Sequence, residues 1–198
     1  MNTFKIHTPQ TTSAAVSTSL SSVIEQLGFL PNVFAVTAGA PPALAAFIAL
    51  NEQFAQTSLS PLEREIVHTA TSVENEAPYC VAGHTAFADL QDLDENTFQA
   101  LRTEAAVDDV KTEALRTFTR RMVEQRGQLS ESELSDFLDA GYSPEQVIEV
   151  VLGITVKIFT NFTSKITGIP LDQPFQNYAW TPADAIRSIA NPPIEEVA

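Results

Sequence analysis

The sequence predicts an all-α protein, and three observations carry this prediction. Apolar residues recur three and four positions apart along most of the chain, which is the spacing of one face of a helix. Helix-start signals such as Ser-Pro and Ser-x-x-Glu precede several of these stretches, and glycine or proline follows them. No stretch shows the sustained alternation of apolar and polar residues that is typical of a strand.

An N-terminal arm and three helices are expected before the central part of the chain. Residues 1–16 are rich in Thr and Ser, which is typical of a flexible or partner-docking segment. A helical stripe of apolar residues at 16–27 precedes Gly28, a residue type that ends many helices in the left-handed conformation. A short helix is expected at 32–38, and the Pro-Pro pair at 41–42 opens a longer one.

A pair of helices is expected at the centre of the chain, joined by the polar turn 74–77. Ser60 can cap the first of these helices, with Pro61 at its first position and Glu63 at the reciprocal capping-box position. Pro78 fits the first position of the second helix. Because the turn is short, we expect the second helix to fold back antiparallel to the first.

Four more helices are expected in the second half of the chain. Their ranges are 94–102, 108–126, 130–141 and 143–166. Ser130 and Ser143 each begin a capping box, which fixes where the last two helices start. No Gly/Ser-rich or Pro-rich linker divides the middle, so we expect a single all-α domain at 17–170. The tail, 171–198, is rich in aromatic residues and is expected to pack on the core or on a neighbouring subunit.

The chemistry is expected around the only cysteine, Cys80. Its place in the first turn of a helix favours a thiolate, because unpaired N–H groups and the positive dipole end lie there. His84 follows four residues later on the same helix face, an arrangement that suits an activated nucleophile. Glu65, on the preceding helix, is placed to orient His84 or to shuttle a proton. The simpler alternative is a buried cysteine beside a packing histidine.

The central residues resemble the signature of the carboxymuconolactone decarboxylase superfamily, closest to its alkyl hydroperoxidase D-like, or peroxidase-related, branch. That branch carries a glutamate, a Cys-x-x-Cys pair, and a histidine four residues after the second cysteine. Glu65 and the run YCVAGH, which ends at His84, are similar to this pattern. Cys80 falls on the second cysteine, whereas Ala77 stands where the family has the first.

The resemblance covers roughly residues 20–175 and implies an alkyl hydroperoxidase D-like helical bundle that forms homo-oligomers, trimers or hexamers. It implies a thiol-dependent antioxidant oxidoreductase that takes a small-molecule peroxide and a thiol reductant and needs no cofactor. The implied catalytic residues are Cys80 as the nucleophile, His84 as its base and Glu65 as a proton relay. Because Ala77 replaces the resolving cysteine, the sulfenic acid needs an external thiol, and we expect impaired turnover.

Two other functions stay open at this point. One is a cofactor-free decarboxylase or other lyase of the same superfamily, with His84 as proton donor beside Glu65 and His68 as a further candidate. An anionic lactone substrate would need a cationic anchor, and only Arg64 is near in sequence. The other is a non-catalytic oligomeric binding protein. Oxidation of Cys80 by peroxide separates the antioxidant function from both.

The composition of the chain argues against some classes of binding partner and suggests a cellular location. The formal net charge of −14 argues against nucleic acid and against anionic membrane surfaces. The most apolar stretch, 147–162, is interrupted by polar residues and is too short for a membrane span. A lone cysteine cannot form an internal disulfide and the N-terminus lacks signal-peptide features, so we expect a cytoplasmic protein. No Cys/His cluster has metal-ligand spacing, and no metal is expected at Glu65, His68 and His84.

Overall fold

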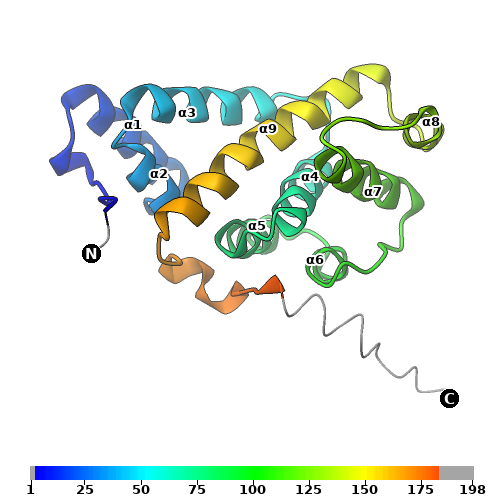
Figure 1. The fold of residues 1–198 in the computed structure, drawn as a ribbon. Helices are drawn as coiled ribbons and strands as arrows, with labels where there is room; N and C mark the ends of the chain where they lie inside the picture. Colours follow the sequence, from blue (N-terminus) through cyan, green and yellow to red (C-terminus); the bar gives the residue numbers. More distant parts are fainter. Residues whose placement is uncertain (1–2, 183–198) are drawn as a thin grey trace, which may run out of the picture.

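The computed structural model describes residues 3–182, and all of the regular structure in that range is helical (Figure 1). The helices are α1 Ala14–Leu27, α2 Asn32–Thr37, α3 Pro41–Ala55, α4 Pro61–Glu74, α5 Pro78–Leu90, α6 Glu95–Arg102, α7 Val110–Glu124, α8 Glu131–Asp139 and α9 Pro144–Thr167. Two short 3-10 helices, η1 Pro9–Thr11 and η2 Gln173–Tyr178, lie near the ends of the described chain. The predicted all-α class is therefore confirmed.

The helix boundaries follow from local signals in the sequence. The Ser60 hydroxyl accepts a hydrogen bond from the Glu63 backbone N–H at 3.2 Å, and the Glu63 carboxylate accepts one from the Ser60 N–H at 2.7 Å. The same reciprocal capping box starts α8 at Ser130 and α9 at Ser143. Gly28 ends α1 in the left-handed conformation, with φ of 78°. These bonds satisfy backbone groups that a helix end leaves unpaired.

Helix α4 forms the centre of the bundle and is buried on every side. All eight residues from Ile66 to Val73 are buried, and α5, α6, α7 and α9 pack around them. Two small polar residues of this stretch bond to their own helix: the Thr71 hydroxyl donates to Val67 O, and the Ser72 hydroxyl to His68 O. These bonds satisfy both hydroxyls inside the core, and the Ser72 oxygen also accepts a hydrogen bond from Asn161 Nδ2 of α9 at 3.1 Å.

Helix α9 crosses α4 closely because of a glycine. A Cβ at Gly153 would lie 2.5 Å from the Phe54 ring of α3 and 2.8 Å from Val67 Cγ1 of α4. Real Cβ atoms do not approach other atoms this closely, so only glycine permits this distance between the helices. Figure 1 shows α9 running diagonally between α3 above it and α4 and α5 below it, and α9 packs against all three. Side chains from its inner face therefore reach the space between α4 and α5.

The chain after α9 returns to the surface of α5. Phe175 of η2 lies over Gly83, where a Cβ would be 3.2 Å from the phenyl ring. The Trp180 indole N–H donates to Arg102 O at 2.8 Å, and the Arg102 guanidinium donates to Tyr178 O at 2.9 Å. The tail as far as residue 182 is therefore held on its own core, and residues 183–198 lie outside the described range.

Helix α9 has 24 residues, more than the apolar stretch expected from the sequence. Its length and composition alone would suit a membrane-spanning helix, the one such case in residues 3–182. It nevertheless packs against α2, α3, α4 and α5, and 44% of its most apolar window is buried inside the fold. Such contacts are typical of a core helix, which passes the same test of length and composition.

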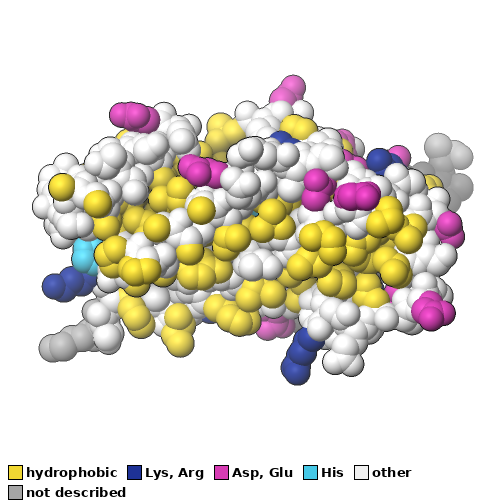
Figure 2. Space-filling model, turned by 90° about the horizontal axis from the view of Figure 1, so that it is seen from above, with side chains coloured by type: hydrophobic (Ala, Val, Ile, Leu, Met, Phe, Trp, Pro, Cys, Tyr) yellow, Lys and Arg dark blue, Asp and Glu magenta, His cyan; other side chains and the backbone are white. Residues whose placement is uncertain are grey.

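One face of α9 leaves a row of apolar side chains exposed. Ile148, Val151, Phe162 and Ile166 recur at helical spacing, and all four are exposed. Figure 2 shows that hydrophobic side chains gather on the surface seen from above the bundle. An exposed apolar row of this kind is a feature of protein–protein interfaces.

We expect the protein to self-associate through this row, and sedimentation equilibrium at micromolar concentration should show a species larger than a monomer. Ile148→Glu combined with Ile166→Glu should shift the association equilibrium towards the monomer, because each charge would have to be buried in the interface. Val110→Glu, at another exposed apolar position on α7, is the matched control and should leave the assembly unchanged. A monomeric parent would contradict the expected homo-oligomer.

Candidate functional site

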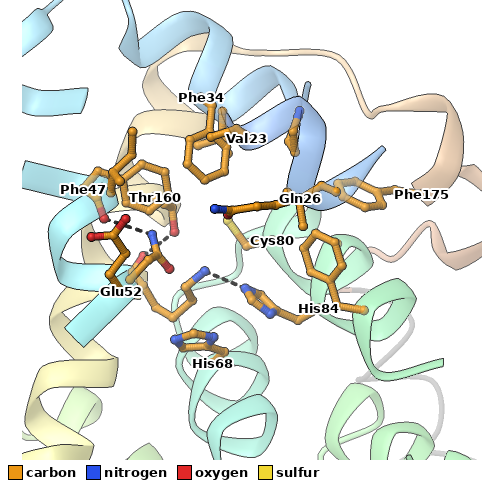
Figure 3. Close-up of a pocket in the computed structure, with 18 of the residues that line it drawn as sticks. Val23, Gln26, Phe34, Phe47, Glu52, His68, Cys80, His84, Thr160 and Phe175 are labelled. Atoms are coloured by element: carbon orange, nitrogen blue, oxygen red, sulfur yellow. Dashed lines mark hydrogen bonds between the residues drawn. The ribbon is translucent and has the colours of Figure 1, made fainter. Parts of the chain in front are cut away.

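A cavity of about 710 Å³ is enclosed by side chains from α1, α2, α3, α4, α5, α9 and η2. Five aromatic side chains line its walls, those of Phe34, Phe47, Tyr79, Phe87 and Phe175. The polar residues that line it are Glu65, His68, Cys80, His84, Lys157 and Thr160, among others. Figure 3 shows Cys80, His84 and His68 close together on one side, with Phe34 and Phe47 across from them. Size and lining are those of a site for a small organic molecule.

Cys80 lies in the first turn of α5, as the sequence predicts. Its backbone N–H donates to the carbonyl of Ala77, the N-cap residue, at 3.0 Å. This turn is held in place by the preceding residue, because the Tyr79 hydroxyl donates to Asp172 Oδ2 at 2.5 Å. The Cys80 side chain is buried, with Sγ 3.7 Å from the Ser164 hydroxyl, and it faces the cavity.

Glu65 and His84 are brought together as the sequence predicts. The distance between Glu65 Oε2 on α4 and His84 Nδ1 on α5 is 2.7 Å. A carboxylate can only accept a hydrogen bond, so Nδ1 carries the proton and Nε2 keeps its lone pair. No hydrogen bond joins His84 to Cys80 within the described residues, although both side chains line the cavity.

Lys157 is the residue of the site that sequence reasoning missed. Its Nζ lies 2.5 Å from His84 Nε2 and donates to that lone pair, which extends the line of hydrogen bonds from Glu65 into α9. The side chain is buried in the described structure. In the sequence, Lys157 is only an interruption of an apolar stretch. A lysine inside the most apolar stretch, 147–162, is the signal that could have identified it, because a lysine is rarely buried without a partner.

Burial sets the protonation states along this line. It is the largest cause lowering the pKa of Lys157, against the raising effects of the Cys80 and Glu65 charges. Burial also lowers the pKa of His84, helped by the positive charge that Lys157 would carry and opposed by Glu65. Burial therefore shifts both groups towards their neutral forms. A neutral Lys157 amine keeps a free lone pair while one of its N–H groups donates to His84.

His68 lies beside this line but is not part of it. Its ring packs between those of Phe54 and His84, with centroids 4.7 and 4.6 Å away. Neither ring nitrogen has a hydrogen-bond partner among residues 3–182, and burial lowers the pKa of His68 well below its ordinary value, so the ring is neutral. His68 is therefore a packing residue that supports the ring of His84.

Three side chains near this point carry donor atoms of the kind that bind metals. Ligand atoms of Glu65, His68 and His84 all lie within 4.8 Å of one another. Both nitrogens of His84 are already engaged, however, one by Glu65 and the other by Lys157. With the side chains in this arrangement His84 offers no lone pair to a metal, so the geometry favours proton transfer over metal coordination.

Part of the candidate site lies in a segment that matches a known protein family. Residues 41–120 match the family model described as the carboxymuconolactone decarboxylase family. This segment includes Glu65, Cys80 and His84, whereas Lys157 lies outside it. No curated protein matches the sequence.

Solved structures share the fold over most of the chain. A peroxidase-related protein from Ralstonia eutropha JMP134, described as an alkylhydroperoxidase AhpD core, has a TM-score of 0.79 at 19% identity, covering 87% of this chain and 93% of that chain. A peroxidase-related protein from Silicibacter sp. TM1040 has a TM-score of 0.74 at 20% sequence identity, and the match covers 82% of this chain and 87% of that chain. The debrominase Bmp8, in a cysteine-to-alanine form bound to 2,3,4-tribromopyrrole, has a TM-score of 0.72 at 18% sequence identity. The match covers 83% of this chain and 89% of that chain. The expected alkyl hydroperoxidase D-like fold is therefore confirmed.

Replacing Lys157 by Met should change how the free energy of unfolding depends on pH. Because the folded-state pKa is depressed, the unfolded chain binds a proton that the folded chain lacks, between that pKa and the unfolded value of about 10.4. Through this window the parent gains stability as pH rises, by up to about 1.4 kcal/mol per pH unit. The variant should lose this dependence.

Urea unfolding of parent and variant between about pH 7 and pH 10 measures the difference. The groups that face Lys157, namely His68, His84, Glu65 and Cys80, are the same in both proteins. Lys165→Met on the exposed side of α9 is the matched control and should keep the slope of the parent. Equal slopes for parent and Lys157→Met would show that Lys157 is not held as a neutral amine.

Proposed function

We propose that this chain, whose residues 41–120 match the carboxymuconolactone decarboxylase family, is a thiol-dependent, peroxidase-related antioxidant enzyme with Cys80 as the nucleophile. One observation carries this proposal above all. The thiol of Cys80 shares a cavity with the amine of Lys157, whose pKa is lowered by burial and which contacts His84 and, through it, Glu65. A thiol, a base and a charge relay are the parts that an activated nucleophile needs.

The first step is transfer of the Cys80 proton to Lys157. The two groups are close enough that a charge on the thiol raises the pKa of Lys157. The ammonium that forms donates to His84 Nε2, and the His84 Nδ1 proton is held by the Glu65 carboxylate. This arrangement differs from the sequence-based hypothesis, because Lys157 rather than His84 takes the proton directly and His84 positions Lys157.

The thiolate then attacks the terminal oxygen of a hydroperoxide, ROOH. The S–O bond forms, the O–O bond breaks, and its electron pair leaves on the alkoxide RO⁻. That alkoxide takes the proton from the Lys157 ammonium, so the products are an alcohol and the sulfenic acid of Cys80. Sulfur is oxidised by two electrons, the peroxide is reduced by two, and the amine returns to its neutral form.

Return of the sulfenic acid to the thiol must use an outside reductant. Ala77 holds the position where the family carries its first cysteine, and the chain has one cysteine in all. A first external thiol would displace water to give a mixed disulfide, and a second would release the free Cys80 thiol. The expected cytoplasmic location would supply such thiols.

The shape of the cavity favours an organic hydroperoxide as substrate. A volume of about 710 Å³ far exceeds what hydrogen peroxide fills. Aromatic walls bind an apolar body, and the polar groups near Cys80 meet its peroxide end. We therefore expect an alkyl or aryl hydroperoxide to react faster than hydrogen peroxide.

Lys157 also supports a second candidate, a lyase acting on a carboxylated lactone. The sequence offered only Arg64 as a cationic anchor, whereas Lys157 can take a proton and pair with a carboxylate inside the cavity. That reaction does not use the thiol. Release of carbon dioxide from such a lactone by parent and Cys80→Ser alike would favour the lyase over the peroxidase.

A pulse of cumene hydroperoxide should oxidise Cys80 in the parent, seen as added oxygen in the intact mass. Lys157→Met should slow this reaction by about a hundredfold near pH 7, the typical size of a general-base contribution. Glu65→Gln should slow it less, since it loses only the charge behind His84. Lys165→Met should react at the parent rate. A Cys80 that resists peroxide in the folded parent would favour a binding protein over an enzyme.

Ala77→Cys should create a functional pair with Cys80. Ala77 is fully buried and lies one helical turn from Cys80, a separation within the range of about 4.4–6.8 Å between Cα atoms that a disulfide requires. After limiting peroxide the variant should form an internal disulfide, because the new thiol attacks the sulfenic acid intramolecularly. With a dithiol reductant it should then turn over repeatedly.

The readout is intact mass with and without thiol alkylation. Ala82→Cys is the matched control, since it adds a buried thiol to α5 two residues from Cys80 and faces away from it. Two alkylatable thiols remaining in Ala77→Cys after oxidation would show that position 77 cannot resolve the sulfenic acid.

A further inference from the structure

The amine of Lys157 has a second chemical capacity that needs no thiol. A neutral amine with a free lone pair is a nucleophile towards carbonyl carbon, and desolvation of a lysine in an apolar site is a recognised way to produce one. A solvated lysine, with a pKa near 10.4, is neutral in fewer than about one molecule in a thousand at pH 7. Lys157 is one of four lysines in the chain, and Lys5, Lys111 and Lys165 are all exposed.

The position of Lys157 makes that nucleophile accessible to a ligand. Although the side chain is 95% buried, with a relative exposure of 5%, it lines the cavity that is large enough for an organic molecule. Its hydrogen bond to His84 uses an N–H group and leaves the lone pair free. The aromatic walls would hold the apolar part of a carbonyl compound, with the carbonyl directed to the polar end of the cavity.

The neighbouring groups are those that imine formation requires. Attack of an amine on a carbonyl gives a carbinolamine, which loses its hydroxyl as water only after that oxygen receives a proton. His84 is in contact with the amine and is linked to Glu65, so it can accept a proton from nitrogen and return one to oxygen. The cavity therefore combines a nucleophile, a proton carrier and space for the ligand.

We propose that Lys157 forms a reversible Schiff base with an apolar aldehyde or ketone bound in the cavity. The C–N bond forms as the Lys157 lone pair attacks the carbonyl carbon, and the C–O bond then breaks. Both amine protons end on the departing oxygen, by way of His84, and leave as water. No oxidant or reductant is consumed, and hydrolysis returns the amine and the carbonyl compound. This activity goes beyond the peroxidase function and does not depend on Cys80.

Reductive trapping tests the proposal. The full-length protein is incubated near pH 7 with benzaldehyde and sodium cyanoborohydride, which converts an imine into a stable benzylamine. We expect peptide mapping to find the benzyl group on Lys157, formed at least about tenfold faster than on Lys5, Lys111 or Lys165, since Lys157 lines the cavity and burial lowers its pKa. Lys157→Arg should abolish this fast phase, and Lys165→Arg should leave it unchanged.

Cys80→Ser separates this proposal from the peroxidase function. The variant should keep fast benzylation of Lys157 and lose oxidation by peroxide, and it also removes any addition of the aldehyde to the thiol. Peptide mapping of the parent protein alone tests the proposal. The result therefore stands even if the Lys157→Arg variant does not fold. Equal labelling of the four lysines, or no label on Lys157, would overturn the Schiff-base proposal whatever Cys80 does.

Discussion

A buried line of hydrogen bonds from Glu65 through His84 to Lys157 joins α4, α5 and α9, and the rest of the site depends on it. A charged ammonium in an apolar interior costs several kcal/mol unless it is fully paired. In this fold burial lowers the pKa of Lys157, and the amine contacts the lone pair of His84. A negative charge at Cys80 or Glu65 raises that pKa again. The same burial that removes the charge also makes the amine reactive.

Sequence reasoning predicted the parts of this protein that local interactions determine. Capping boxes at Ser60, Ser130 and Ser143 act within four residues, so the starts of three helices could be found without the fold. The pairing of Glu65 with His84 was also predictable, because a three-residue turn folds α5 back on α4.

The role of Lys157 could not be predicted in this way. It lies 73 residues beyond His84 in the chain, and the two meet only because α9 crosses the α4–α5 pair. Its neighbours in sequence are apolar, so local pattern marks it as a break in a core helix. The cavity is hidden for the same reason, since its walls come from seven separate elements. Non-local packing therefore determines both the base and the substrate space.

The glycine at the crossing of α9 and α4 has a consequence for the chemistry. Gly153 and Lys157 lie one helical turn apart on the same side of α9. The missing methyl group thus controls how deeply the lysine reaches towards His84. A design rule based on helix propensity would choose alanine here, for a gain of up to about 1 kcal/mol in an isolated helix. In this protein alanine would push α9 outward and lengthen the contact between Lys157 and His84. A substitution that stabilises the isolated helix would therefore disturb the site.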